Sequence, residues 1–262
     1  MILAVDAGNT NVVLGTIENG EILNVLRLHT DLNSTAEEYS ITIRQLMDFY
    51  GIEVEKLDGA ILSSVVPPVT RPLVSAIRRL TGKECMVVGP GMKTGMNVRL
   101  DDPGSLASDL AVGAVAAIAC YGAPVIVLDM GTATSMVVVD GKGAFRGGAI
   151  MPGVTLGLQA LSAGTSLLPD ISVMQPKKAI GTNTVEAMRS GAVFATASMI
   201  DGMAERMETE LGEKCRVIAT GSLAKVITSC CRREIICDSH LLLKGLWLLW
   251  ERNHREKSSE RK

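Results

Sequence analysis

Aromatic side chains are scarce in this chain of 262 residues, which has two tryptophans, three tyrosines and three phenylalanines. Proteins that bind single-stranded nucleic acid stack successive bases on aromatic rings, and this supply is too small for such a surface. A basic field is missing as well, because 26 lysines and arginines face 28 aspartates and glutamates, a net charge of −2. The composition therefore argues against nucleic acid and against an anionic membrane surface as partners.

The six cysteines lack the spacing of a metal site. There is no Cys-x-x-Cys pair and no Cys/His zinc pattern among them, and strand-like residues begin at Ile2 with no signal peptide before them. We therefore expect reduced thiols and a cytoplasmic protein.

A long uncharged run, residues 111–128, comes close to the ~18 residues of a membrane-spanning helix. The turn signal Tyr121-Gly122-Ala123-Pro124 interrupts it, between an alanine-rich stretch that ends at Cys120 and the β-rich residues 125–128. We predict a buried helix followed by a buried strand, and no membrane segment.

Glycine, in contrast, is abundant, with 26 residues. Some of the glycine-containing turns occur twice, because the second half of the chain repeats the first. Residues 125–132, Val-Ile-Val-Leu-Asp-Met-Gly-Thr, align with residues 2–9, Ile-Leu-Ala-Val-Asp-Ala-Gly-Asn, and residues 215–222 match the strand at 59–66. Such duplication predicts two similar α/β domains, residues 1–115 and 116–262, with a ligand cleft between them.

The first half also shows a clear order of elements. Three antiparallel strands are predicted near residues 2–5, 11–17 and 22–29, the last two joined by an Asn-Gly hairpin turn. Helices follow at 36–49 and 70–81, and strands at 59–66 and 85–88.

The turn after the first strand has the residues of a phosphate site. Gly8 allows main-chain N–H groups to approach an oxyanion, the side chains of residues 9–11 add donors, and Asp6 can hold a magnesium ion. Aspartate, glycine and asparagine are also ordinary turn residues. The second copy at residues 129–134 favours the phosphate interpretation, since two such loops across a cleft would clamp a polyphosphate and its cation.

Asp109 lies early on a helix that we expect to begin at Pro103, with Asp102 as its N-cap, and to end at Cys120. An acid there stabilises the helix dipole by about 0.3–1 kcal/mol. The same carboxylate is suited to act as a general base for a substrate hydroxyl in phosphoryl transfer. Spacing does not choose between these interpretations.

Three further features have both a structural and a functional interpretation. Residues 147–153 and 220–222 form two more glycine-rich turns, which turn the chain or bring its backbone against a nucleotide. Thr184 precedes a helical run over 185–207 and is a candidate N-cap as well as a site residue.

Taken in order, these motifs resemble those of type III pantothenate kinases, over nearly the whole chain. The matching pieces are Asp6-Ala7-Gly8-Asn9-Thr10-Asn11, Gly89-Pro90-Gly91 with Thr94-Gly95, Asp109, Asp129-Met130-Gly131-Thr132-Ala133-Thr134, Gly147-Gly148 with Pro152-Gly153, Gly181 with Asn183-Thr184, Thr220-Gly221, and Gly245-Leu246 with Glu251-Arg252-Asn253. The resemblance implies two duplicated actin-like, ribonuclease H-like domains and transfer of the ATP γ-phosphate to pantothenate, the first step of coenzyme A synthesis.

The resemblance also implies roles for single residues. Asp109 would be the proton acceptor, Asp129 would help bind potassium or ammonium, and Thr132 would contact ATP with its Mg²⁺. The ATP phosphate loop would comprise Asp6, Ala7, Gly8, Asn9, Thr10, Asn11, Val12 and Val13. The pantothenate pocket would be lined by Ala107, Ser108, Asp109, Leu110 and Thr184. A cytoplasmic homodimer is expected.

Several positions depart from the family pattern. Residues 107–110 read Ala-Ser-Asp-Leu where the pattern is Gly-Ala-Asp-Arg, so Leu110 replaces an arginine suited to the substrate carboxylate. Val137 stands in place of an aspartate, and Ala195 and Ser222 in place of glycines. Two alternatives therefore stay open: a kinase of a related small alcohol without a carboxylate, and a catalytically weak paralogue that acts as a nucleotide-binding regulatory protein.

Overall fold

The computed structural model describes residues 1–259, with side chains through residue 254. These residues form two compact units, each with its own sheet. Unit 1 comprises residues 1–96 and 102–116 and the segment from Leu241 onward, and unit 2 comprises residues 97–101 and 117–240. The expected division at residues 115 and 116 counts the C-terminal segment with the second half, whereas this segment packs in unit 1.

The C-terminal helix α8 (Leu241–Ser259) belongs to unit 1 because its apolar side chains pack against the sheet of that unit. Its apolar side chains, among them Leu246 and Trp250, share a buried cluster with Ile2 and Ile61 of the first sheet. The Asn253 amide adds two hydrogen bonds of 3.1 Å, one from the N–H of Lys93 and one to its carbonyl oxygen. The helix thus covers one sheet face of unit 1 and holds the loop that follows β5.

The sheet of unit 1 has five strands in the order β3-β2-β1-β4-β5. The first three strands are antiparallel, as predicted, while β4 and β5 run parallel to β1. Their bounds are β1 (Ile2–Ala7), β2 (Asn11–Glu18), β3 (Glu21–His29), β4 (Gly59–Ser64) and β5 (Cys85–Val87). The carboxyl ends of β1, β4 and β5 therefore meet at one edge, where ligands commonly bind in such sheets.

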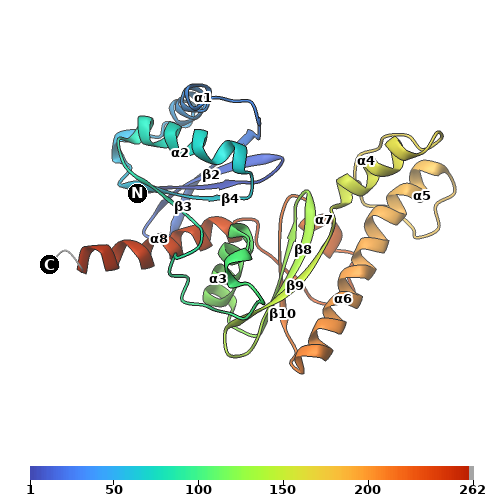
Figure 1. Cartoon of the computed structure of the whole chain (residues 1–262). Coiled ribbons are helices and arrows are strands. Elements are labelled where there is room, and N and C mark those ends of the chain that lie inside the picture. Colours follow the sequence, from blue (N-terminus) through green and yellow to red (C-terminus); the bar gives the residue numbers. More distant parts are fainter. Residues whose placement is uncertain (260–262) are drawn as a thin grey trace. The chain divides into compact units, whose positions relative to one another are not determined.

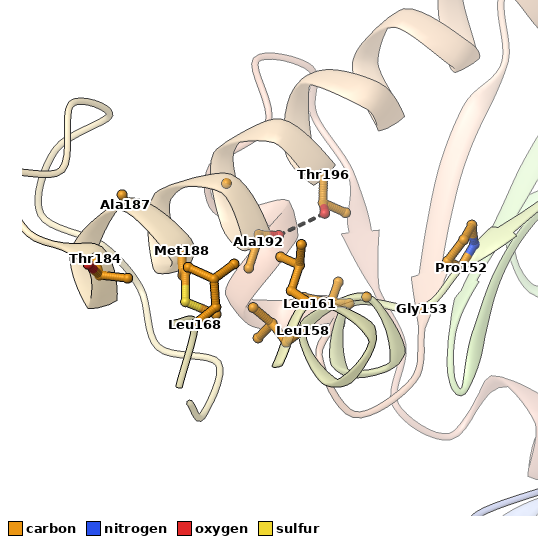
Figure 2. Close-up of a pocket in the computed structure, with 13 residues that line it drawn as sticks. Pro152, Gly153, Leu158, Leu161, Leu168, Thr184, Ala187, Met188, Ala192 and Thr196 are labelled. Atoms are coloured by element: carbon orange, nitrogen blue, oxygen red, sulfur yellow. Dashed lines mark hydrogen bonds between the residues drawn. The ribbon is translucent and has the colours of Figure 1, made fainter. Parts of the chain in front are cut away.

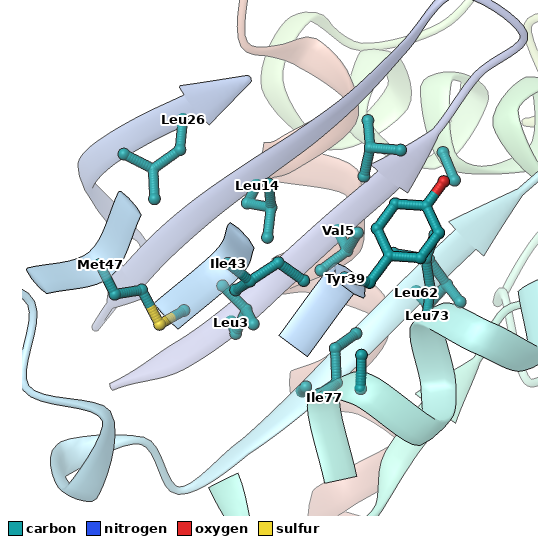
Figure 3. Packing of buried hydrophobic residues seen from close by; sticks show 14 of the residues in the cluster. Leu3, Val5, Leu14, Leu26, Tyr39, Ile43, Met47, Leu62, Leu73 and Ile77 are labelled. Atoms are coloured by element: carbon teal, nitrogen blue, oxygen red, sulfur yellow. The ribbon is translucent and has the colours of Figure 1, made fainter. Parts of the chain in front are cut away.

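Helices cover both faces of this sheet (Figure 1). The first face packs against α1 (Ala36–Phe49) and α2 (Pro67–Thr81), and Figure 3 shows Leu14, Ile43 and Ile77 meeting in that core. The Thr35 hydroxyl and the Glu38 carboxylate form a capping box at the start of α1. The second face packs against α8 and α3 (Ser108–Tyr121). Two 3₁₀ turns, Val54–Lys56 and Pro103–Ser105, lie between these elements.

Unit 2 repeats this topology. Its sheet has the order β11-β10-β7-β8-β9-β6, so β9-β8-β7-β10-β11 matches β3-β2-β1-β4-β5 strand for strand. The bounds are β6 (Asn97–Val98), β7 (Val125–Met130), β8 (Ala133–Val139), β9 (Ala144–Pro152), β10 (Arg216–Thr220) and β11 (Ile236–Cys237). The predicted duplication is confirmed, including the equivalence of β10 with β4.

One face of the second sheet is covered by a long, interrupted helix (Figure 1). It consists of α5 (Thr184–Ser190), a π-helical turn (Gly191–Ala195) and α6 (Thr196–Leu211). The remaining helices of this unit are α4 (Val154–Gly164) and α7 (Ala224–Thr228). Buried side chains of the interrupted helix, including Val193 and Ile200, pack on Leu128 and Met136 of the sheet.

Three helix starts differ from the predictions. The helix predicted at 70–81 begins at Pro67, since proline is tolerated in the first turn of a helix. Asp102 does cap a helical turn at Pro103, but this is the short 3₁₀ turn, and α3 begins separately at Ser108. Asp109 therefore lies in the first turn of α3. Asn183 caps α5 by accepting a 2.9 Å hydrogen bond from the N–H of Glu186, so Thr184 is the first helical residue rather than the cap.

The uncharged run at 111–128 is divided as predicted, into most of α3 and the start of β7. Among the residues that the structure describes, no helix is both long and apolar enough to cross a bilayer.

Candidate functional site

The loop between β1 and β2 is a compact turn in unit 1. The N–H of Gly8 donates to the carbonyl oxygen of Asn11 at 3.0 Å, and Thr30 closes the loop by donating its hydroxyl to the carbonyl oxygen of Gly8 at 2.6 Å. The side chains of residues 9–11 are exposed, and those of Ala7 and Val12 are buried. Ala7 and Val12 can therefore offer a ligand only their main chain, whereas Asn9 and Asn11 present amides to it.

Asp6 lies at the carboxyl end of β1, beside Ser63 in the parallel ladder with β4. Its side chain is half-buried and points to the same sheet face as Ile2 and Ala4. A single carboxylate beside a phosphate loop suits Mg²⁺, which commonly takes one or two carboxylates and completes its shell with water and substrate phosphates.

Asp109 belongs to the same face of unit 1, in the first turn of α3. Burial raises the pKa of its carboxyl, and the main-chain N–H groups of Leu110 and of Asp109 itself oppose the rise. The Leu110 N–H donates to Oδ1 at 2.7 Å. A carboxyl group with a raised pKa binds a proton more readily than an ordinary aspartate, as a general base requires.

The neighbours of Asp109 in the predicted substrate pocket are all half-buried. Ala107 accepts the first helical hydrogen bond, from the N–H of Ala111. Ser108 directs its hydroxyl to the end of β4, with Oγ donating to the carbonyl oxygen of Ser64 and accepting from Ser63, each at 3.1 Å. Leu110 contributes a main-chain donor to the carboxyl but no charged group.

The corresponding loop of unit 2, between β7 and β8, is one residue shorter. The N–H of Gly131 donates to the carbonyl oxygen two residues ahead, at Ala133, whereas Gly8 reaches three residues ahead. Asp129 is half-buried here and Thr132 is exposed. The two loops are related by duplication but present different main-chain geometry to a ligand.

Two of the glycine-rich turns meet at this second loop. Gly153 donates its N–H to the carbonyl oxygen of Thr132 at 3.1 Å, and a Cβ at Gly153 would collide with the Thr132 and Gly131 carbonyls. Gly221 has a φ of +99°, and its Cβ would collide with the main chain of Met130. Glycine at both positions is therefore required for the loop to keep its shape.

Thr184 lines a pocket of about 620 Å³ in unit 2 (Figure 2). The pocket lies between α4 and the interrupted helix, with the π-helical turn in its wall, and its lining is mostly apolar. The lining residues are Pro152, Gly153, Val154, Gly157, Leu158, Leu161, Leu168, Thr184, Ala187, Met188, Gly191, Ala192 and Thr196. Gly153 thus links this pocket to the loop that carries Thr132.

The predicted site residues are divided between the units. Asp6 to Val13 and residues 107–110 belong to unit 1, and Asp129, Thr132 and Thr184 belong to unit 2. Within the described part of the chain, no three His, Cys, Asp or Glu side chains are grouped so that they could hold a metal ion.

The sequence reasoning missed two residues that support unit 1's loops, Thr30 and Ser63. Ser63 is fully buried, and Thr30 is nearly so. For Ser63 the available signal was the pair of serines that ends an apolar strand, at residues 63 and 64, because a buried polar side chain needs a hydrogen-bond partner.

The chain is similar to known proteins over nearly its whole length. The family model described as type III pantothenate kinase matches residues 2–206. Two curated type III pantothenate kinases, from Halalkalibacterium halodurans and an Exiguobacterium species, are each 40% identical to the chain. Each match covers 97% of this chain and 100% of the relative.

Solved structures confirm the predicted fold. A putative Baf family transcriptional activator from Campylobacter jejuni aligns with a TM-score of 0.61 at 17% identity, covering 97% of this chain and 100% of its own. A putative 2-dehydro-3-deoxygalactonokinase from Sinorhizobium meliloti aligns with a TM-score of 0.58 at 13% identity, covering 95% of each chain. The duplicated α/β architecture is that of the actin-like ATPases and sugar kinases. On the sequence matches, the chain belongs to the type III pantothenate kinase family.

Proposed function

We propose that this protein transfers the γ-phosphoryl group of ATP to the primary hydroxyl of pantothenate, giving 4′-phosphopantothenate and ADP in the first step of coenzyme A synthesis. The 40% identity to curated type III pantothenate kinases over 97% of the chain carries this proposal. Asp109, half-buried at the start of α3, would supply the base that the reaction needs.

In this reaction the substrate hydroxyl oxygen attacks the γ-phosphorus, and the bond from that phosphorus to the β,γ-bridging oxygen breaks. The hydroxyl proton passes to the Asp109 carboxylate, and the electron pair of the broken bond leaves with ADP. Burial supports this role, because it raises the pKa of Asp109 and makes the carboxylate a better proton acceptor.

Residues 6–13 would bind the ATP phosphates through main-chain N–H groups and the exposed side chains of Asn9, Thr10 and Asn11. Asp6 would hold Mg²⁺, and the ion would supply positive charge to stabilise the ATP phosphates. Thr132, exposed on the second loop, would contact ATP, and Asp129 beside it would help bind potassium or ammonium.

Residues 107–110 and Thr184 would line the pantothenate pocket, Ser108 with its main chain, because Ser63 and Ser64 engage its hydroxyl. The apolar lining around Thr184 suits the dimethyl carbon of pantothenate, and the threonine hydroxyl suits its polar groups. Leu110 offers no cation to the substrate carboxylate, a contact that could be worth about 2–5 kcal/mol where the charge is buried.

A coupled assay for ADP release tests the proposal. Purified protein with ATP, Mg²⁺ and K⁺ should release ADP only when pantothenate is added, and omission of K⁺ should lower the rate. Absence of pantothenate-dependent ADP release, at protein concentrations where a curated relative is active, would refute the assignment.

A second candidate substrate is a related alcohol without the carboxylate, favoured by Leu110. The matched pair is pantothenate and its alcohol analogue, in which CH₂OH replaces the carboxylate. A higher kcat/KM for the analogue would favour the second candidate, and a higher kcat/KM for pantothenate would show that other groups bind the carboxylate.

We also propose that the protein is a cytoplasmic homodimer. The support for the dimer is that several large apolar side chains of unit 2 are exposed, and a partner would cover them: Leu156, Leu161, Leu167, Met174 and Ile180. Leu167→Glu should shift the mass measured by light scattering toward the monomer. Phe49→Glu, at an exposed aromatic residue of unit 1, is the control and should leave the mass unchanged. A monomeric wild-type protein would contradict the dimer.

A further inference from the structure

Two serine hydroxyls connect α3 to the first sheet at the end where the phosphate loop lies. Ser63 Oγ donates to Ser108 Oγ at 3.1 Å, and Ser108 Oγ donates to the carbonyl oxygen of Ser64 at 3.1 Å. The chain of hydrogen bonds therefore runs from inside β4 to the first residue of α3 and back to the last residue of β4.

Each end of this connection adjoins a residue of the proposed chemistry. Ser63 is the ladder partner of Asp6, which begins the phosphate loop. Ser108 directly precedes Asp109, the proposed base. A bond between the two serines thus joins the strand beside the phosphate loop to the helix turn that carries the base.

The hydroxyl of Ser108 is already engaged in both directions, because it accepts one hydrogen bond and donates another within unit 1. Ser63 has no exposed surface at all, so its hydroxyl serves only internal partners. These contacts are those of a structural tie rather than of a side chain that waits for a ligand.

We propose that Ser63 and Ser108 are positioning residues, which hold the Asp109 turn of α3 at a fixed place relative to the phosphate loop. This inference rests on the proposed function, since it assumes that Asp109 accepts the substrate proton. Phosphoryl transfer depends mainly on alignment, and a displacement of about 1 Å can cost ~10²-fold in rate. Loss of one of several hydrogen bonds that hold this helix turn should lower the rate by less than about 10²-fold.

The test compares Ser63→Ala, Ser108→Ala and the double variant in the ADP-release assay with pantothenate. We expect each single variant to lower kcat by about 5- to 20-fold while the KM values for ATP and pantothenate stay within about twofold. The double variant should lose no more than the worse single variant, because both changes remove the same hydrogen bond.

Ser40→Ala is the matched control. Ser40 is also half-buried and donates to a helix carbonyl, that of Ala36, but it belongs to α1 on the opposite face of the sheet. Its kcat should equal that of the wild type. Because Ser63 is fully buried, Ser108→Ala, which changes a half-buried side chain, serves as the informative variant if Ser63→Ala does not fold.

The outcomes separate the two proposals. A wild-type enzyme without pantothenate-dependent ADP release refutes the proposed function and this inference with it. An active wild type with an unchanged kcat in Ser108→Ala overturns the positioning role alone. A raised KM for pantothenate at unchanged kcat also overturns it, because the hydroxyl would then contact the substrate. Multiplicative losses in the double variant would show that the serines act separately, which is likewise against the proposal.

Discussion

Replacing Asp109 by asparagine should separate catalysis from stability. The change keeps the shape of the side chain and the oxygen that accepts the Leu110 N–H, and it removes the carboxylate. Loss of a general base typically costs ~10²- to 10⁴-fold, so kcat should fall by that factor with little change in the KM for ATP. The measurement is ADP release at saturating substrates.

Although its kcat should fall, the Asp109→Asn variant should be more stable than the wild type near neutral pH. Burial raises the pKa of Asp109 in the folded protein above the value of 3.8 for an unperturbed carboxyl, so the folded state binds the proton more tightly than the unfolded state does. The resulting contribution to the free energy of unfolding is present at low pH and is lost as the pH rises through the folded pKa. The asparagine side chain has no charge to desolvate, so Asp109→Asn should melt at a higher temperature than the wild type near pH 7, with the difference shrinking toward pH 4.

Asp102→Asn is the control for both measurements, since it removes an exposed charge seven residues away and keeps the oxygen that caps the 3₁₀ turn. It should retain wild-type kcat. More than a tenth of the wild-type kcat in Asp109→Asn would refute the base assignment. A melting temperature below that of the wild type near pH 7 would refute the burial argument.

Three further changes probe packing, a buried charge and substrate choice. Gly148→Ala should destabilise the protein by about 1–3 kcal/mol in urea unfolding, because its Cβ would collide with the main chain of β8; an unchanged midpoint would contradict this. Burial alone would raise the pKa of Glu208, but hydrogen bonds from Lys214 and Arg233 and from a main-chain N–H leave it lowered. Its contribution to stability should therefore disappear as the pH falls through that lowered value, and Glu208→Gln should remove this pH dependence from thermal melts. Leu110→Arg should lower the KM for pantothenate in the ADP-release assay, and an unchanged KM would show that this position does not bind the carboxylate.

Most elements of unit 1 could be predicted from the sequence, because turn residues and apolar patterns within short segments define them. The Asn19-Gly20 turn and the β-rich residues on either side of it define a hairpin without help from the rest of the chain. The duplicated Asp-x-Gly turn predicted that unit 2 resembles unit 1, and the strand order of the second sheet matches that of the first. The length of the second loop was not evident, because deletion of one turn residue leaves the motif letters aligned.

Helix starts were predicted less accurately. Asp102-Pro103 is a strong start signal, and it does begin a helical turn, yet Leu106 takes an extended conformation and ends that turn before α3. Tertiary contacts determine where α3 begins. Ser108 donates a hydrogen bond to the end of β4, and Val112 and Val115 of α3 pack against the sheet. A sequence window around Pro103 contains none of those partners.

The packing of the C-terminal helix against unit 1 could not be predicted from the local sequence either. Its apolar residues predict packing against some surface, but their partners Ile2, Ile17 and Ile61 lie nearly the length of the chain away. Gly245 shows how close the packing is, since a Cβ there would collide with the main chain of Val112. Periodicity indicates that a face is buried and does not name the element that buries it.

The place of α8 has a consequence for the newly made protein. On the ribosome the strands of unit 1 emerge before unit 2, and the helix that covers one face of their sheet emerges only after residues 117–240 have been made. At a synthesis rate of roughly 5–20 residues per second, that face, with Ile2 and Ile61 on it, lacks this helix for about 6–25 s. Unit 2 can complete its own core during this interval. A helix translated after unit 2 therefore completes the sheet of unit 1 that was made before it, and nascent chains stalled before Leu241 should be the ones that chaperones recognise through this apolar face.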